Sequence, residues 1–363
     1  MARLGDYVRI RTGKLDANAS SDDGAYPFFT CAAEPLRIDN YSYDCECVLV
    51  AGNGDLNVKY YNGKFDAYQR TYIIESLNKD VLSVPYLFCF LDKYIETLRK
   101  ESIGGVIKYI KLGNLTEANI PILPLAQQEA VVHICNETNQ LIALRKQQLA
   151  KLDELVKARF VEMFGDVIRN DKGWPQRVFS EVATSRLGKM LDTKQQTGKH
   201  SYPYLANFNV QWFRFELKNL NQMDFDEDDQ IEFSLQEGDL LVCEGGEIGR
   251  CAVWHNEIQP CFFQKALHRV RCDRSVILPD YLAWWFKYNC EHGGFSAIEG
   301  AKATIAHLPG AKLKSLIVTV PSVSIQEEFV SFVSQTDKSK LAVQQSIDQL
   351  ETLKKSLMQK YFG

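Results

Sequence analysis

Short β-like runs of apolar and polar residues alternate with glycine-rich turns in two separate stretches of the chain. These runs fall at 7–10, 47–51 and 71–74 in the first stretch, and at 240–243, 251–254 and 267–271 in the second. Runs of this length between such turns are typical of β-strands. A helical pattern follows in each stretch, over 84–99 and 279–292, with Pro85 or Pro279 at its start, where a helix tolerates proline. The pattern predicts two mixed α/β modules, each an open or strongly curved sheet with peripheral helices.

Two long polar segments, 128–165 and 326–363, carry apolar residues at heptad-like spacing. The seams consist of Ile142, Leu149, Leu152, Val156 and Met163 in the first segment, and of Val343, Ile347, Leu350, Leu357 and Tyr361 in the second. Lysine or arginine interrupts each seam, so neither segment is a strong coiled coil alone. We expect the two helices, each roughly 57 Å long, to pair as an antiparallel coiled coil. The alternative is two amphipathic helices that pack only on their own modules.

The two halves of the chain are copies of one unit. The long segments match without a gap at the opening Gln-Glu, at Thr138 and Thr336, at Leu152 and Leu350, and at the closing Phe-Gly. The modules match at Gly13-Lys14 with Gly188-Lys189, at Tyr26-Pro27 with Tyr202-Pro203, and at Gln69-Arg70 with Gln264-Lys265. The second module is roughly 20 residues longer, and we expect the additional residues around the acidic loop 221–229.

The repeat predicts four segments in a pseudo-two-fold symmetric arrangement, with the two modules at opposite ends of the paired helices. The segments are a first module (module 1, 1–125), a first spacer helix (126–165), a second module (module 2, 174–321) and a second spacer helix (322–363). Each module is long enough to bury a core of its own.

Net charge and cysteine content exclude only a few classes of function. The net charge of −4 argues against a protein that binds nucleic acid alone through bulk charge, and suits one that relies on a basic partner. Ten cysteines are scattered without a C-x-x-C pair, so zinc and disulfide frameworks are not expected. We expect no signal peptide, because the first residues lack an apolar core region, and no apolar run is long enough to span a membrane. We expect a cytoplasmic protein.

Motifs for chemistry are missing from the sequence. It contains no P-loop, no H-E-x-x-H and no metal-like spacing of its six histidines. The glycines of LVCEGGEIGR, at 241–250, are those of a tight turn, because no helix follows them to bind a phosphate. Neither the catalytic turn nor the cofactor glycine motif of an adenine methyltransferase occurs. We therefore expect no catalytic residue, no metal and no cofactor in this chain.

The architecture resembles the specificity subunit of type I restriction–modification systems. The resemblance rests on two divergent modules, each followed by a similar long helix that ends near Phe-Gly, and on the sequence IPILPLAQQ at 120–128 before the first helix. The second copy, VTVPSVSIQEE at 318–328, has its proline displaced. The resemblance implies two target-recognition domains that each read half of a bipartite sequence in double-stranded DNA. It also implies helices that dock two modification subunits, which bind S-adenosylmethionine and methylate adenine, and a separate motor–nuclease restriction subunit.

DNA-contacting residues are expected among the basic and amide side chains of the loops, because such groups reach base edges and phosphates. Matched loop residues are the first candidates, and other loop cations follow. The set is Lys14, Lys59, Gln69, Arg70, Lys108 and Lys111 in module 1, and Lys189, Arg250, Gln264, Lys265, Lys302 and Lys312 in module 2. Lys59, Lys108 and Lys111 are matched more loosely with Arg250, Lys302 and Lys312.

Two other functions fit the same sequence. The chain could be a scaffold whose two β-rich modules hold other proteins, which its net acidity favours slightly. It could also be the specificity chain of a related restriction system that cuts on both sides of its site. A neighbouring gene with an Asn/Asp-Pro-Pro-Tyr/Phe methyltransferase motif would favour DNA recognition over the scaffold.

Overall fold

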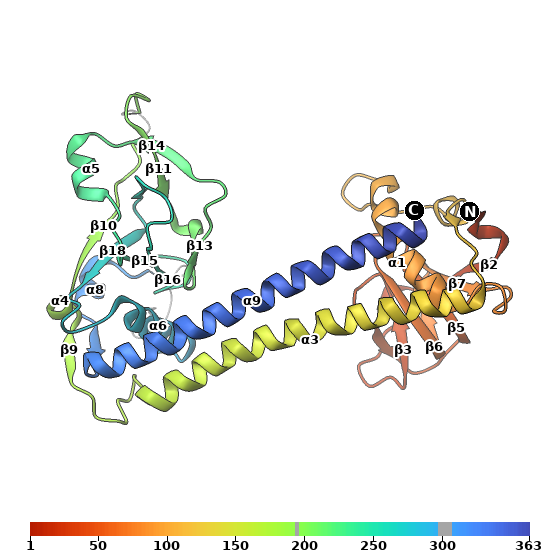
Figure 1. Ribbon diagram of the computed structural model, residues 1–363, viewed down its shortest axis with the longest axis horizontal. Helices are drawn as coiled ribbons and strands as arrows, with labels where there is room; N and C mark the ends of the chain where they lie inside the picture. Colours follow the sequence, from red (N-terminus) through yellow and green to blue (C-terminus); the bar gives the residue numbers. More distant parts are fainter. Residues whose placement is uncertain (193–195, 297–306) are drawn as a thin grey trace. The chain divides into compact units, whose positions relative to one another are not determined.

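The computed structural model describes residues 1–192, 196–296 and 307–363 (Figure 1). The chain forms two compact units: unit 1 comprises Met1–Gln148 and Ala342–Gly363, and unit 2 comprises Leu149–Leu341. Each unit thus contains one module, part of the long helix α3 (Leu125–Phe164) and part of the long helix α9 (Val323–Phe362). No helix in the described ranges is long and apolar enough to cross a membrane. The four segment boundaries given above stay a prediction.

Unit 1, all of whose residues the structure describes, is built on a sheet of order β2-β7-β5-β6-β3-β4. The β3–β6 pair is parallel and the other neighbouring pairs are antiparallel. The strands are β1 (Ala2–Arg3), β2 (Val8–Thr12), β3 (Tyr26–Phe29), β4 (Leu36–Ile38), β5 (Tyr43–Ala51), β6 (Val58–Ala67), β7 (Thr71–Ser76) and β8 (Asn119–Ile120). The helices besides α3 and α9 are α1 (Val84–Glu101), α2 (Leu112–Thr116) and the short 3₁₀ helices η1 (Leu4–Asp6) and η2 (Ala17–Ala19).

The core of unit 1 lies between α1 and the sheet. Helix α1 starts where the hydroxyl of Ser83 accepts a hydrogen bond from the Tyr86 amide, with proline in the first turn. Its buried face includes Leu87 and Leu91, which join Val48 of the central strand β5 in one apolar cluster. Because β5 is covered on both faces, its second half is apolar throughout rather than alternating.

Unit 2 repeats this plan with smaller sheets. In its described part, a sheet of order β10-β18-β15-β16 lies beside a sheet of order β14-β11-β17 and the pairs β12-β13 and β9-β19. The strands are β9 (Gln176–Val178), β10 (Ala183–Leu187), β11 (Ser201–Leu205), β12 (Val210–Gln211), β13 (Arg214–Phe215), β14 (Asn221–Asp224), β15 (Leu240–Cys243), β16 (Cys251–Val253), β17 (Phe262–Phe263), β18 (Leu267–Cys272) and β19 (Ile317–Thr319). The helices are α4 (Phe179–Val182), α5 (Glu227–Phe233), α6 (Pro279–Glu291), α8 (Gly310–Lys314) and the 3₁₀ helix η4 (Asn207–Asn209).

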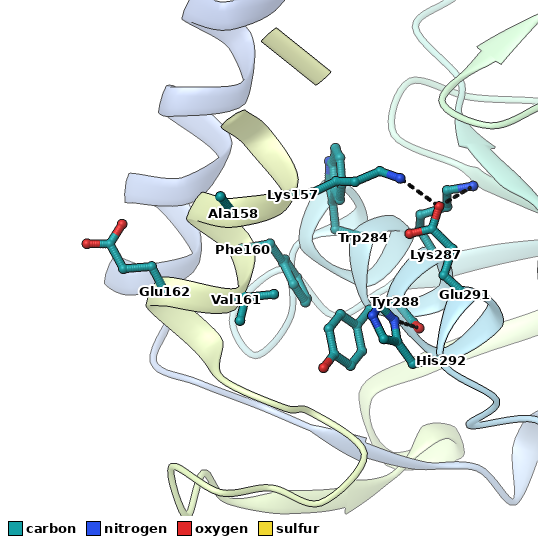
Figure 2. Close-up of a pocket in the computed structure, with 10 residues that line it drawn as sticks. All are labelled: Lys157, Ala158, Phe160, Val161, Glu162, Trp284, Lys287, Tyr288, Glu291 and His292. Atoms are coloured by element: carbon teal, nitrogen blue, oxygen red, sulfur yellow. Dashed lines mark hydrogen bonds and ion pairs between the residues drawn. The ribbon is translucent and has the colours of Figure 1, made fainter. Parts of the chain in front are cut away.

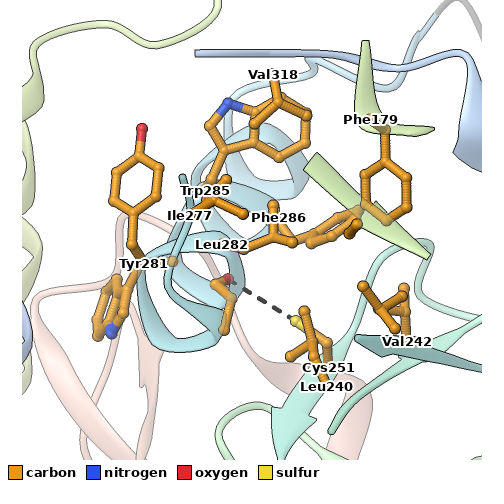
Figure 3. Packing of buried hydrophobic residues seen from close by; sticks show 14 of the residues in the cluster. Phe179, Leu240, Val242, Cys251, Ile277, Tyr281, Leu282, Trp285, Phe286 and Val318 are labelled. Carbon is orange, nitrogen blue, oxygen red and sulfur yellow. Dashed lines mark hydrogen bonds between the residues drawn. The ribbon is translucent and has the colours of Figure 1, made fainter. Parts of the chain in front are cut away.

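In unit 2 the helix α6 takes the place of α1. Leu282 and Phe286 of α6 lie against Leu240 and Val242 of β15 in the main apolar cluster (Figure 3). The thiol of Cys251, on the neighbouring strand β16, is within 3.8 Å of the Ala283 carbonyl oxygen. The predicted helices over 84–99 and 279–292 and the predicted strands are thus confirmed.

The additional residues of module 2 are only partly where the sequence places them. Part of the insertion forms α5, which overlaps the end of the expected acidic loop 221–229, but another part precedes that loop as the β12–β13 hairpin. In this hairpin Phe213 has a positive φ of 62° and stacks on Trp284 of α6, with ring centroids 4.4 Å apart. The hairpin was missed because its strands have two residues each, too few to show alternation.

Within each unit the two long helices run antiparallel. In unit 1, Lys146 of α3 forms an ion pair of 3.3 Å with Glu351 of α9, while the earlier residue Cys135 contacts the later residue Met358. In unit 2, Asp153 pairs with Lys340 at 2.7 Å and Arg159 pairs with Glu328 at 2.6 Å. Residue numbers rise along one helix as they fall along the other, so the predicted antiparallel pairing is confirmed. All ten predicted seam residues are buried or half-buried.

Each unit buries the C-terminal end of the helix that begins in the other module. In unit 1, Phe362 of α9 packs on Tyr86 of α1, with ring centroids 5.2 Å apart. In unit 2, Phe164 of α3 packs on Tyr281 of α6 at 4.8 Å. Both phenylalanines belong to the repeated Phe-Gly ending. The mixed α/β class and the two-module plan are confirmed, and the alternative of helices that pack only on their own modules is wrong.

Candidate nucleic-acid interface

A glycine ends the first long strand of each module because two backbone segments meet there. A Cβ on Gly13 would lie 2.1 Å from the carbonyl oxygen of Ala67, and one on Gly188 would lie 2.3 Å from that of Gln264. The amide of Gly13 donates to the Thr71 carbonyl at 3.1 Å, and that of Gly188 donates to the Leu267 carbonyl at 3.0 Å. The matched Gly-Lys dipeptides therefore lie against the segments that carry the other matched candidates, Gln69-Arg70 in module 1 and Gln264-Lys265 in module 2.

The backbone hydrogen bonds define which of these residues correspond. The Tyr68 amide donates to Phe29 and the Gln264 amide donates to Leu205, both at 2.9 Å across a parallel strand pair. Next along the chain, the Gln69 amide donates at 2.9 Å to Leu15, two residues after Gly13, and the Lys265 amide donates at 2.8 Å to Lys189, one residue after Gly188. Tyr68-Gln69 thus corresponds to Gln264-Lys265, and the match of Gln69-Arg70 with that dipeptide is wrong by one residue. The sequence match followed the chemical similarity of Gln-Arg to Gln-Lys. The strand pairing shows that the correct alignment is shifted by one residue.

Two further loops reach the same edge in both modules. The Gly52 amide donates to the Arg70 carbonyl at 2.8 Å, and the Glu244 amide donates to the Ala266 carbonyl at 2.9 Å. The carbonyls of Gly52 and Glu244 in turn accept from Ile110 at 2.9 Å and from Leu308 at 2.6 Å. One set of backbone contacts therefore assembles the same four loops twice. We call this the loop edge; in each module it carries the Gly-Lys turn and the candidate loop that follows β6 or β17.

On the loop edge of module 1, most candidate side chains are exposed. Lys14, Arg70, Lys108 and Lys111 all point to solvent, and the Gly54 amide, which donates to the Lys108 carbonyl at 2.9 Å, holds Lys108 next to the Gly52 loop. Gln69 is exposed, and its side-chain amide donates to Asp16 at 2.7 Å.

Lys59 differs from these residues because it is partly buried. Its ammonium donates to the Ala32 carbonyl at 2.7 Å, and burial lowers its pKa. Lys59 therefore holds the loop after β3 as well as offering a charge.

Module 2 holds its candidates more tightly. The Lys189 ammonium contacts the Asp229 carboxylate and donates to the Asp224 carbonyl at 2.7 Å. Gln264 is half-buried, whereas Lys265 is exposed. Lys312 is exposed on α8, and Lys302 lies outside the described residues.

Arg250 has a structural partner rather than a free guanidinium. It donates to the carbonyl oxygen of Asn207 at 3.1 Å and to the side-chain oxygen of the same residue at 2.8 Å.

In module 1 the position equivalent to Arg250 is Asn57, whose side chain donates to the Cys31 carbonyl at 2.8 Å. The carbonyls of Asn57 and Arg250 accept from Ala51 and Cys243, which establishes their equivalence. The sequence match of Lys59 with Arg250 is therefore wrong, and Arg250 ties the loop after β11 to the sheet.

The sequence reasoning missed a pair of buried glutamines at the starts of the long helices. The side-chain oxygen of Gln128 accepts from the Ser83 amide at 2.9 Å, and its nitrogen donates to the carbonyls of Val81 and Leu123, both at 2.7 Å. Gln326 makes the equivalent bonds to Leu278, Val276 and Pro321. The signal was present in the repeated Gln-Glu, but a polar residue at a helix start suggests solvent exposure.

Grooves lie at corresponding places in the two units. In unit 2, a groove of about 710 Å³ runs between the end of α3 and α6, with Phe160, Trp284 and Tyr288 along it (Figure 2). Lys157 pairs with Glu291 at its rim, at 2.8 Å. In unit 1, a groove of about 520 Å³ lies between the end of α9 and α1, lined mostly by charged residues. Both offer recessed surface on the paired helices.

The described residues contain no group of three His, Cys, Asp or Glu side chains that could hold a metal ion. The buried His268 serves the fold instead, because its Nε2 lies 3.0 Å from the Leu308 carbonyl and burial lowers its pKa.

A family model described as the type I restriction modification DNA specificity domain matches residues 1–154 and, a second time, residues 171–352. The two matches cover most of the chain, each taking in one module and most of the long helix that follows it. The chain therefore belongs to the family of type I restriction–modification DNA specificity proteins.

Curated relatives carry the same description. The type I restriction enzyme EcoDI specificity subunit of Escherichia coli is 34% identical over 154 residues, which cover 42% of this chain and 34% of that protein. A type I restriction enzyme specificity subunit of Haemophilus influenzae is 24% identical over 377 residues, covering 92% of this chain and 88% of that protein. The chain thus spans about a third of the first relative and most of the second.

Solved structures share the fold. The type I restriction-modification S subunit from M. genitalium covers 100% of this chain and 95% of its own length, with a TM-score of 0.59 and 15% identity. A second structure concerns the complex assembly and conformational transition of the type I R-M system. One of its chains gives a TM-score of 0.63 at 15% identity over 99% of this chain and 96% of its own length.

Proposed function

We propose that each module reads one half of a bipartite sequence in double-stranded DNA, with its loop edge against the duplex. The observation that carries this proposal is the loop edge itself. The same backbone contacts assemble it in both modules, while its side chains differ. Two modules that read different DNA sequences require the same backbone frame with different side chains on it. The side chains that contact the bases specify the sequence, and the frame positions them.

The paired helices α3 and α9 serve as spacer and as the docking surface for modification subunits in this proposal. Two half-sites read on one face of DNA have centres about 34 Å apart, one helical turn. The grooves beside the helix ends, at corresponding places in the two units, support docking by related partners at each. Two modification subunits and a motor–nuclease restriction subunit would complete the complex.

Methyl transfer to adenine is assigned to the modification subunits, which would bind S-adenosylmethionine. The chain itself would contribute sequence recognition and no catalytic group, which the lack of methyltransferase motifs in its sequence supports. Its net charge of −4 supports a division of labour in which partners supply much of the phosphate contact that dominates DNA affinity.

Methylation profiling of the host genome, with and without this gene, tests the proposal. We expect one bipartite motif with methylated adenines, with two short half-sites and an unread gap, and expect its methylation to vanish on deletion. An unchanged methylation profile in a strain whose modification subunit is expressed would contradict DNA recognition and favour the scaffold function.

A further inference from the structure

The acidic helix α5 is a feature of module 2 without a counterpart in module 1. Helix α5 lies between β14 and β15, whereas the equivalent strands β4 and β5 are joined by a short connection. Its sequence, EDDQIEF, contains four carboxylates in seven residues. The insertion therefore adds negative charge to one DNA-reading module and not to the other.

The carboxylates of α5 lie against the cations of the first strand. Asp229 pairs with Lys189, which follows the glycine of the loop edge, and Glu232 pairs with Arg186 on β10. The helix end adds uncharged acceptors, since the carbonyls of Glu232 and Ser234 accept from Arg269 on β18 at 2.8 and 2.9 Å. Arg186 and Arg269 lie directly opposite each other on neighbouring strands. Arg186, Lys189 and Arg269, which lie on one surface, thus all have oxygen partners on the inserted helix or at its C-terminal end.

Module 1 has no inserted helix over the equivalent surface, and its lysine is open. Lys14, next to Gly13, is exposed and has no side-chain partner among the residues that the structure describes. Arg11, which occupies the strand position of Arg186, pairs with Glu75 of its own sheet rather than with an inserted helix. The modules therefore differ at the lysine beside the glycine turn, which is available in module 1 and held by a carboxylate in module 2, whereas the strand arginine has a carboxylate partner in both.

Carboxylate and phosphate oxygens compete for the same donors. An ammonium or guanidinium that is held by a carboxylate cannot place the same N–H groups on a DNA phosphate. Few apolar contacts hold α5: Phe233 is its buried residue, and Ile231 is 80% exposed. The Arg186–Glu232 pair is exposed, whereas the Lys189–Asp229 pair is partly buried. An exposed ion pair is weak enough for a polyanion to displace it.

We propose that Arg186 is a further phosphate contact of module 2, together with Lys189, and that Asp229 and Glu232 occupy both cations until DNA replaces them. This inference rests on the proposed function, because it concerns the same DNA-reading module. Helix α5 would act as an internal competitor that lowers the affinity of module 2 for DNA of any sequence.

The test compares two double substitutions that remove the same charge from the same helix. Asp229→Asn with Glu232→Gln removes the carboxylates that contact the cations. Glu227→Gln with Asp228→Asn removes two exposed carboxylates that make no side-chain contact in the described part of the chain. The full chain, assembled with its modification subunits, is titrated against a random-sequence DNA duplex by fluorescence anisotropy at fixed salt.

We expect the substitutions of Asp229 and Glu232 to raise affinity roughly three- to tenfold above those of Glu227 and Asp228, as the loss of one exposed and one partly buried ion pair implies. Arg186→Gln should weaken binding to all sequences about equally and reduce the slope of log affinity against log salt by about 1. Equal effects of the two double substitutions, or an unchanged salt slope for Arg186→Gln, would overturn the inference. Failure of the unaltered complex to bind any DNA would instead overturn the proposed function.

Discussion

Gln128 and Gln326 make the same three hydrogen bonds at corresponding positions of the two units. Each side chain is fully buried at the start of a long helix. Each joins the helix to the segment before α1 or α6 and to the loop between β8 or β19 and the long helix. This repeated glutamine therefore ties the start of each long helix to its own module.

Replacing either glutamine with methionine keeps the volume and removes the polar group. We expect Gln326→Met to lower the free energy of unfolding by about 1–3 kcal/mol, because two carbonyls and an amide lose their buried partner. Gln128→Met should do the same in unit 1. Chemical denaturation of the purified chain measures this, with the exposed Gln349→Met as control, expected within about 0.5 kcal/mol of wild type. Equal stability of all three variants would show that the glutamines do not hold the helix starts.

The antiparallel pairing of the helices predicts a crosslinking pattern within unit 2. Cysteines at 153 and 340 should be joined efficiently by a short bis-maleimide, because Asp153 and Lys340 form an ion pair of 2.7 Å. Cysteines at 153 and 328 should not, since Glu328 pairs with Arg159, more than one helical turn away. Mass spectrometry of the crosslinked peptides distinguishes these pairs from the native cysteines. The reverse pattern would refute the observed register.

Arg250 is a structural cation, whereas Lys265 is a proposed DNA contact. Arg250→Gln should destabilise the protein by about 1–3 kcal/mol, because the Asn207 carbonyl and side-chain oxygens lose a charged donor. It should leave the salt dependence of DNA binding unchanged. Lys265→Gln, at an exposed position, should leave stability unchanged and, as a lost phosphate contact, reduce the salt slope by about 1. Denaturation and salt titration of both variants check this, and swapped behaviour would contradict both assignments.

His268 makes unit 2 sensitive to acid. Burial lowers its pKa in the folded state, so below the ordinary histidine pKa of about 6.5 the unfolded chain binds a proton that the folded chain refuses. Stability should therefore fall as the pH drops below about 6.5. His268→Gln should reduce this loss between about pH 7.5 and about pH 5.5, whereas His200→Gln, at an exposed position, should not. Thermal unfolding at the two pH values measures it, and an identical pH dependence of wild type and His268→Gln would exclude this role.

The long helices and the main strands could be predicted from sequence because they have a strong period and are present twice. The repeated Phe-Gly and Gln-Glu were visible, but their roles were not. Phe164 and Phe362 are anchors in the unit built on the other module, a long-range contact that no local pattern encodes. Gln128 and Gln326 are buried polar residues with partners in the segments before α1 and α6, so the polar pattern of the long helices gave no sign of their burial.

The candidate interface was predictable at the level of loops and less so at the level of side chains. Gly13 and Gly188 marked the turn because only glycine permits that backbone approach. The register of the following loop depended on a parallel strand pair between β3 and β6 or β11 and β17, and sequence likeness misjudged it by one residue. Arg186 was overlooked because it lies inside a strand, and its pairing with Glu232 of α5 is visible only in three dimensions.

The central claim is that each module reads its own half of the target, and an exchange of modules tests it most directly. Residues 174–318 are replaced with the equivalent module of a relative, and adenine methylation is mapped across the genome of a host that expresses the modification subunits. The account predicts that one half-site changes to that of the relative while the other half-site stays unchanged. Alteration of both half-sites, or of neither, in a chain that still supports methylation would contradict it.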